Sequence, residues 1–238
     1  MQTHCMAHMP RVATFHLFSW QGLTQSLQAL AFDRFRFRKS KGLEFIRVLG
    51  TGEGRSTAPG SELTRTALFC LFETEQDADH FVAQVGDRRG TRESWHVKMR
   101  GAGGHGAWRG KDIPQLLGSP ASRSSGSIEP LAVITRAQVR VAAWRVFANE
   151  ARIVDAELQG SDGLLAVVGI GEMPIRRLGT FSLWRSPGAM QDFARRRPEH
   201  SRVVARTRAE RWYGEEMFAR FTPYWSTGSW DGHDPLQS

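Results

Sequence analysis

A histidine at position 200 has neighbours that would support imidazole chemistry. Pro198 stands two residues before it, and because proline is favoured in the first turn of a helix, the sequence predicts that a helix starts there. His200 would share the apolar side of this helix with Val203, Val204 and Thr207. The positive end of the helix dipole favours neutral imidazole, which is the form that binds metals. His200 is therefore a candidate metal ligand, and the alternative is a buried or partly exposed histidine with a structural hydrogen bond.

Other ionisable residues are weaker candidates. His16 shares a face of a predicted strand with Thr14 and Phe18 and is expected to point into the barrel, so it is the second candidate ligand. His80 lies off the apolar side of a predicted helix, and His96 shares a strand face with a lysine and an arginine, so both are expected to be solvated. Glu53 and Glu172 recur at matching places in the chain. They are either paired carboxylates or, as is commoner for glutamate, exposed or salt-bridged residues.

Several kinds of active site are excluded by their missing motifs. The chain has no G-x-S-x-G nucleophile elbow and no zinc-binding spacing of His, Glu and Cys. Its Gly-x-Gly strings lack the third glycine of a dinucleotide loop and the Gly-Lys-Ser/Thr of a phosphate loop. The two cysteines, Cys5 and Cys70, make neither a metal-ligand spacing nor a disulfide framework, which is consistent with a reducing cytoplasm.

The chain contains an internal repeat. The string VLGTGEG at 48–54 recurs as VVGIGEM at 167–173. Three further matches follow in the same order: residues 67–82 with 179–194, ESW at 93–95 with ERW at 210–212, and GAWRGKD at 106–112 with GSWDGHD at 228–234. Four matches in one order, each about half a chain apart, indicate two copies of one folding unit.

Hydrophobic periodicity gives each copy the order β-α-β-β-α-β. Strands are expected at 12–19, 44–50, 64–72 and 95–101, with helices at 23–35 and 75–85. The second copy has strands at 131–139, 164–171, 178–184 and 221–230, with helices at 142–157 and 187–212. In the first helix, Leu23, Leu27, Leu30 and Phe35 are expected to face the sheet.

A βαββαβ unit covers only one sheet face with helices, so the open faces of two units must bury each other. The sequence therefore predicts an α+β fold in which two tandem ferredoxin-like repeats pack sheet to sheet as an intramolecular α+β barrel. The predicted boundaries are 1–115 for the first repeat, 116–130 for a Ser/Gly/Pro-rich linker, and 131–238 for the second repeat. A ligand site is expected in the barrel interior or on its flank.

The net charge of the chain indicates which kinds of molecule it could bind. Of the 238 residues, 32 are Lys or Arg against 24 Asp or Glu, a formal charge of +8, and all but four of the cations are Arg. This charge favours an anionic ligand, nucleic acid or an acidic membrane surface, and the alternative is arginine on solvated faces. No nucleic-acid-reading motif is present, so we expect no nucleic acid partner. Because there is neither a signal peptide nor an apolar stretch long enough to cross a bilayer, we expect a cytoplasmic protein.

Six strings together resemble one known family. They are GTGEG, GIGEMP, TFSLW…GAMQDFA, PEHSR, W…EEMFARF and GSWDGHDP, in order from about residue 12 to about residue 235. In this combination the chain is similar to the spheroidene monooxygenase family of bacterial carotenoid-modifying enzymes, most closely in its second half. None of these strings is a catalytic signature by itself.

The resemblance implies a haem-dependent enzyme that uses O2 and an electron donor to oxidise an acyclic carotenoid at C-2 to a ketone. It also implies kinship with dimeric α+β barrel proteins, several of which bind haem through a histidine. His200 matches the family histidine in PEHSR, so the resemblance implies that it binds the iron of haem b, leaving the other iron face open for O2. Arg202 and Arg206 could pair with the haem propionates. A homo-oligomer and weak contact with a membrane surface would be compatible with this function.

The sequence departs from the family pattern in two places. Phe45-Ile46-Arg47 replaces an FWK-like string, and Arg176-Arg177-Leu178 stands where the family often has a His-Gln pair. Both lie at strand ends that are expected to line the pocket, so the substrate is left open between a carotenoid and another apolar or amine-bearing molecule. The alternatives are a haem enzyme of dehydratase or N-oxidation type, a haem-free barrel with a ligand pocket, and a basic binding module.

Overall fold

The computed structural model describes residues 11–52, 62–86, 88–118, 129–172, 177–196, 207, 210 and 212–237. The first half contains β1 (Val12–Trp20), α1 (Leu23–Phe37), β2 (Leu43–Thr51), β3 (Glu62–Phe72), α2 (Glu75–Gly86), β4 (Thr91–Gly106) and α3 (Ile113–Leu116). The second half contains β5 (Leu131–Val139), the 3₁₀ turn η1 (Val141–Ala143), α4 (Trp144–Gln159), β6 (Leu164–Glu172), β7 (Arg177–Trp184), α5 (Pro187–Arg196) and β8 (Tyr213–Gly228). The predicted order β-α-β-β-α-β is confirmed in both halves.

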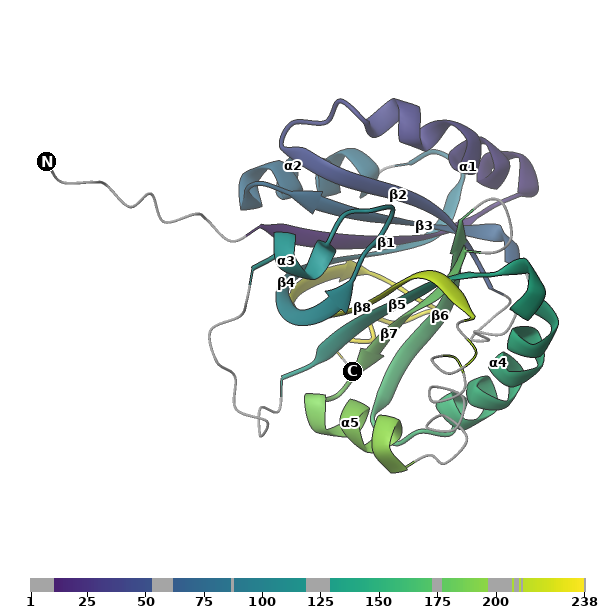
Figure 1. Cartoon of the computed structure of the whole chain (residues 1–238). Coiled ribbons are helices and arrows are strands. Elements are labelled where there is room, and N and C mark those ends of the chain that lie inside the picture. The colour runs from purple at the N-terminus through teal and green to yellow at the C-terminus, as the bar shows by residue number, and fades with distance from the viewer. Residues whose placement is uncertain are drawn as a thin grey trace, which may run out of the picture.

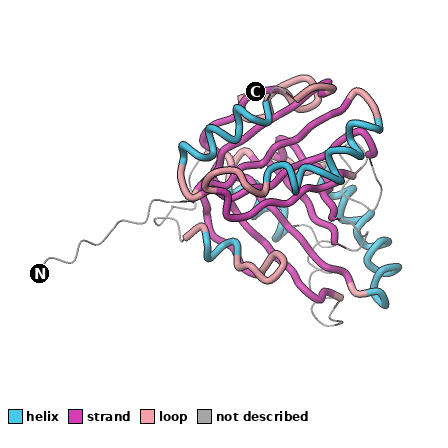
Figure 2. Tube along the Cα trace, turned by 90° about the horizontal axis from the view of Figure 1, so that it is seen from above, coloured by secondary structure: helices cyan, strands magenta, loops and turns pink. Residues whose placement is uncertain are grey.

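The eight strands close into one antiparallel barrel in the order β1-β3-β2-β6-β7-β5-β8-β4 (Figure 1). Each half contributes four neighbouring strands. The halves join where Gly50 of β2 pairs with Gly171 of β6 and along the long pair β4–β8. Figure 2 shows the strands forming the barrel with the helices outside it. The prediction of an intramolecular α+β barrel built from two ferredoxin-like repeats is confirmed. The domain boundaries at 115 and 130 stay predictions, and residues 119–128 lie outside the described part.

Among the described residues, no helix has the length and apolar character needed to cross a bilayer.

Strand register fixes which residues of the two repeats are equivalent. Leu43 of β2 and Leu164 of β6 each pair with the last residue of the neighbouring strand, and both strands shift register directly afterwards. Counted from these two leucines, Gly50 is structurally equivalent to Gly171. The sequence match aligns Gly50 with Gly169, so it differs from the structural equivalence by two residues. The match of ESW with ERW is wrong as a structural equivalence, because Trp95 lies inside β4 and Trp212 precedes β8.

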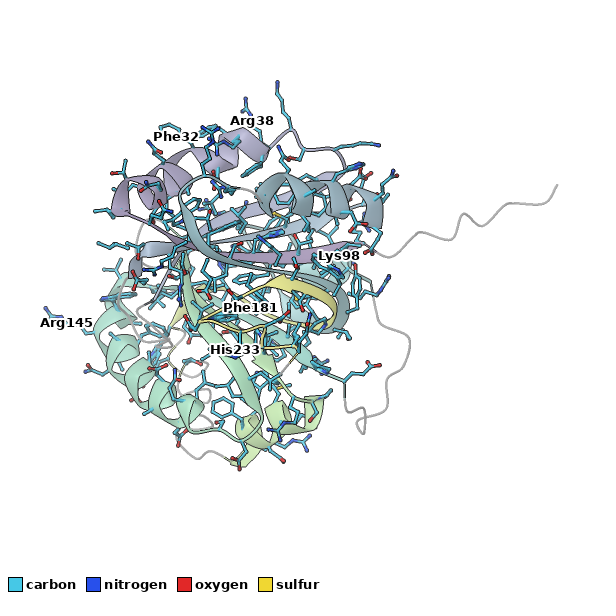
Figure 3. All side chains as sticks on the ribbon, turned by 180° about the vertical axis from the view of Figure 1, so that it is seen from behind. Phe32, Arg38, Lys98, Arg145, Phe181 and His233 are labelled. Atoms are coloured by element: carbon cyan, nitrogen blue, oxygen red, sulfur yellow. The ribbon has the colours of Figure 1, made fainter. Side chains whose placement is uncertain are left out.

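The barrel interior is filled with side chains, many of them aromatic. Trp108 stacks on Phe69 at 5.4 Å between ring centroids, and its equivalent Trp230 lies 6.2 Å from Phe181. Phe181 in turn stacks on Phe15 at 3.9 Å, and Figure 3 shows Phe181 in the middle of the molecule. All five residues are at least 97% buried. The part of the chain that the structure describes therefore leaves the interior to packing, and the predicted ligand site must be on the flank.

The apolar side predicted for α1 is wrong. The helix buries a different set: Ser26, Ala29, Asp33 and Phe37. Small residues let α1 lie close to the sheet, and Asp33 is neutralised below the helix by Arg88, whose Nη2 donates to it at 2.7 Å. The leucines and Phe35 that periodicity placed inward therefore lie to the side of or opposite the buried face.

We predict that Trp108→Ala destabilises the barrel by about 3–5 kcal/mol, because it leaves a cavity among rings that have no room to relax. The matched control Trp225→Ala removes an indole that is 37% exposed and should cost under about 1 kcal/mol. Urea unfolding measures both. An equal loss of unfolding free energy in the two variants would contradict a filled interior.

Candidate functional site

The residues predicted to hold a cofactor, His200, Arg202 and Arg206, lie outside the described residues, in the connection between α5 and β8. Both of these elements belong to the second repeat. The described part of this repeat shows the outer sheet face formed by β5, β6 and β7, and this face differs from its counterpart in the first repeat.

The outer face of the first repeat is filled by large side chains. His16 and Phe18 of β1 and Leu68 of β3 point outward, each at most 1% exposed. Helices α1 and α2 press on them: the His16 ring lies 5.4 Å from that of Phe81, and the guanidinium of Arg88 lies 4.9 Å from the ring of Phe18. No space remains there for a ligand.

The equivalent positions of the second repeat carry small side chains. The first residue of β1 pairs with the last residue of β3, and the first residue of β5 pairs with the last residue of β7. Four residues further along, the pair His16–Leu68 in β1–β3 therefore corresponds to the pair Thr135–Thr180 in β5–β7. Phe18 then corresponds to Ala137. By the same register, Val48 of β2 corresponds to Gly169 of β6. We call the four positions Thr135, Ala137, Gly169 and Thr180 the hollow face.

Helix α4 is the helix that runs beside the hollow face (Figure 1). It packs at its ends: Leu158 joins a small cluster with Val167 and Trp184, and Phe147 contacts Tyr213 at 6.2 Å. Figure 1 shows α4 running along the outside of β6. Three of the four hollow-face residues are only half-buried although they lie in the middle of a sheet.

The hollow face offers flat apolar contact with one polar point. Thr135 Oγ1 and Thr180 Oγ1 lie 2.7 Å apart, so one hydroxyl donates a hydrogen bond to the other. Leu178, one of the residues at which this chain departs from the family pattern, lies on the same side of β7 beside Ala137 and borders the face. The hollow face carries no carboxylate, imidazole or thiol. It can therefore hold a flat apolar group, and any acid–base or metal-binding side chain must reach it from another segment.

No metal site is formed by the described residues: nowhere in them do three or more His, Cys, Asp or Glu side chains gather. A hollow of about 620 Å³ lies at the far end of the second sheet, beside the start of α5. It is bordered by the exposed Asp162, Arg185 and Asp192. Its polar, open rim does not suit an apolar ligand.

Glu172 lies in a salt-bridged cluster at one mouth of the barrel. Its carboxylate is 3.2 Å from Arg47 Nε, 3.4 Å from Arg109 Nε and 3.7 Å from Arg136 Nη2, and Arg136 also pairs with Glu215. Burial lowers the pKa of Arg47 to about 10. The salt-bridged alternative for Glu172 is confirmed, and Glu53 lies outside the described residues. Arg47, the other departure from the family pattern, points into the barrel mouth and does not line the hollow face.

His16 and His96 form a buried pair on the outer face of the first repeat, under α2. Their Nδ1 atoms are 3.0 Å apart, so one ring donates and the other accepts, and His16 Nε2 bonds Thr14 at 2.8 Å. The expectation that His96 is solvated is wrong, because α2 covers this strand face. The expectation that His16 points into the barrel is wrong, because its side chain lies on the outer face of the sheet, against Phe81 of α2. His80 is exposed as expected.

Burial keeps both rings neutral. It lowers the pKa of His16 well below 6.5, with the neighbouring His96 and Arg88 adding to the effect, and lowers the pKa of His96 to about 4. Unfolded histidines titrate near 6.5, so the unfolded chain binds more protons below that pH. The contribution of this pair to stability is complete above about pH 6.5 and is lost as the pH falls toward 4.

We predict that the free energy of unfolding falls by up to about 1.4 kcal/mol per pH unit for each histidine between pH 6.5 and 4. His16→Gln/His96→Gln should have a flatter profile in this window, and the control His80→Gln should keep the wild-type slope. Urea unfolding at a series of pH values measures the slopes. A double variant with the wild-type slope would show that the pair does not titrate as described.

Known proteins resemble this chain in sequence and in fold. No protein family model matches it. The spheroidene monooxygenase of Rhodobacter capsulatus is 27% identical over 236 residues, covering 95% of this chain and 96% of that protein. The spheroidene monooxygenase of Rubrivivax gelatinosus is 35% identical over 195 residues, covering 80% of this chain and 73% of that protein.

A solved structure of an aldoxime dehydratase shares the fold, with a TM-score of 0.57 and 10% sequence identity over 91% of this chain and 82% of that chain. At this identity the likeness concerns the fold alone. The sequence relationship is much stronger, and it extends over most of both chains. The chain belongs to the spheroidene monooxygenase family.

Proposed function

We propose that this chain is a haem-dependent monooxygenase that inserts oxygen from O2 into an acyclic carotenoid or a similar long apolar molecule. Family membership gives the coarser part of this assignment, an oxidoreductase of monooxygenase type that acts on a small molecule. The haem, the substrate class and the site are the finer part. The observation that carries them is the hollow face, because equivalent positions hold small side chains in the second repeat and large ones in the first.

The hollow face fits a haem group by shape and chemistry. Gly169 and Ala137 put little bulk above the sheet, and the hydroxyls of Thr135 and Thr180 are hydrogen-bonded to each other. A flat macrocycle could pack there between the sheet and α4, as apolar ligands do in largely preformed sites. When bound, haem with one protein ligand would supply an open iron position at which O2 is activated.

In this proposal the chain's own residues bind and orient. His200 would ligate the iron as neutral imidazole, and Arg202 and Arg206 would hold the propionates, as the resemblance to the family implies. Leu178 would contact the bound group at the border of the hollow face, and the buried cluster of Val133 and Val167 would exclude water at the other end. Because the hollow face has no acid or base, the described residues would position the substrate and transfer no proton.

The proposed reaction converts a CH2 group into a ketone in two rounds. In each round one O2 molecule, two electrons from an external reductant and two protons replace a C–H bond by C–OH and release one water. The second round on the same carbon gives a geminal diol, which loses water to leave C=O. A ketone that carries label from isotopic O2, formed only with a reductant, would support this assignment. Aldoxime dehydration without O2 would identify a haem dehydratase instead.

We predict that purified protein reconstituted with haemin shows a sharp Soret band that is lost or shifted in His200→Ala, because the axial imidazole is removed. The control His233→Ala changes an exposed histidine and should leave the band unchanged. Absorption spectroscopy of the three proteins is the measurement. Absence of specific haem binding in the wild type would eliminate the cofactor assignment and leave a haem-free barrel.

We also predict that Ala137→Phe, which restores the residue found at the equivalent position of the first repeat, lowers haem affinity at least about tenfold by filling the hollow face. Ala137→Ser keeps the space and should bind haem as the wild type does. Haemin titration measures affinity, and thermal unfolding of the haem-free proteins checks that Ala137→Phe still folds. Unchanged affinity in a folded Ala137→Phe protein would place the haem elsewhere.

A further inference from the structure

The exposed surface of α1 carries four large apolar side chains among polar ones. Leu23 is 44% exposed, Leu27 51%, Phe32 61% and Phe35 63%. These are half of the eight large apolar residues that are exposed in the described part of the chain, and all four lie on one helix. Figure 3 shows Phe32 projecting from the helix layer into solvent. Apolar side chains concentrated on one helix mark an interaction surface.

Cations surround these apolar side chains. Arg34, Arg36, Arg38, Lys39 and Lys41 are all exposed and follow one another within eight residues. Residues 21–42 contain one carboxylate, Asp33, which is buried and bound to Arg88. Two of the cations have an acidic neighbour, since Arg36 lies 3.8 Å from Asp33 and Lys41 3.8 Å from Asp77. Arg34, Arg38 and Lys39 are exposed, and Figure 3 shows Arg38 on the same helix layer as Phe32.

We propose that α1 docks the protein on the surface of an anionic membrane. The helix would lie in the plane of the interface with Phe32, Phe35 and Leu27 in the boundary between headgroups and acyl chains, and with its arginines against lipid phosphates. The guanidinium of Arg38 lies 5.9 Å from the centroid of the Phe35 ring, so the charge sits beside the ring that would enter the lipid. Aromatic anchors next to cations suit this depth of a bilayer.

Charge argues for a membrane over a second copy of this chain. A symmetric dimer through α1 would bring two cationic rims together without carboxylates to pair them, which is unfavourable. A bilayer containing anionic lipid would bury the apolar side chains of α1 and neutralise its cations. This inference goes beyond the proposed function, and it requires neither the haem nor the substrate.

Sedimentation with lipid vesicles tests this proposal on the full chain. The vesicles are phosphatidylcholine alone or phosphatidylcholine with about one-third phosphatidylserine. We expect the wild type to bind the anionic vesicles and to release as salt rises, because salt screens exposed charges. Phe32→Ser/Phe35→Ser should weaken binding at least about tenfold, and Arg34→Glu/Arg38→Glu should remove the preference for anionic lipid. The control Leu63→Ser, which changes an exposed residue on β3, should bind like the wild type.

Circular dichroism verifies that each variant is folded, as expected for changes at exposed positions. The proposal is overturned if the wild type binds neither vesicle, binds both equally, or binds as well after Phe32→Ser/Phe35→Ser. Concentration-dependent dimerisation that this double variant abolishes, without vesicle binding, would assign α1 to a second copy and also overturn it.

Discussion

The closure of eight strands into a barrel is the constraint on which the rest of the molecule depends. An eight-stranded barrel has an interior just wide enough for side chains or for one small ligand. Here the two equivalent tryptophans, Trp108 and Trp230, and the rings around them fill that interior. Because side chains occupy the interior, the proposed ligand site lies between the sheet and the helices, and the side chains on the outer face of each repeat decide which repeat can hold it.

The two repeats have divided their roles through a few side chains on the same backbone. In the first repeat His16, Phe18 and Leu68 fill the outer face, and the ion pair between Asp33 and Arg88 lets α1 sit tightly over it. In the second repeat the equivalent positions are threonine, alanine and threonine, and the described contacts of α4 include Leu158 and Phe147, near its two ends. In the proposal made above, the first repeat acts as a scaffold and the second holds the flat ligand.

Much of the architecture follows from the sequence. Periodicity and the internal repeat predicted the element order and the barrel, because each strand alternates clearly and each repeat leaves one sheet face to bury. The residue-by-residue equivalence of the two repeats did not follow from the sequence, because aligning the Gly-x-Gly strings shifts the second strands of the two repeats by two residues. The buried side of α1 was missed because Ser26 and Asp33 are polar, and their burial depends on Arg88, which is distant in sequence.

The hollow face was missed for a related reason. A run such as Leu131–Val139 reads as an ordinary strand, and its small residues acquire meaning only when they are set beside Val12–Trp20 in the correct register. The pattern also placed His96 with Lys98 on a solvated face, since nothing local shows that α2 covers it. The residues around His200 and the family resemblance both pointed to this histidine, and its role stays a prediction.

Hydrogen–deuterium exchange with and without haemin tests the central claim most directly, namely that the ligand lies between the second sheet and α4. Local protection reports where binding suppresses opening. The account predicts that haemin slows exchange in α4, residues 144–159, and leaves α1, residues 23–37, unchanged. Protection of α1 and α2 instead, or stoichiometric haem binding with no change in α4, would contradict it.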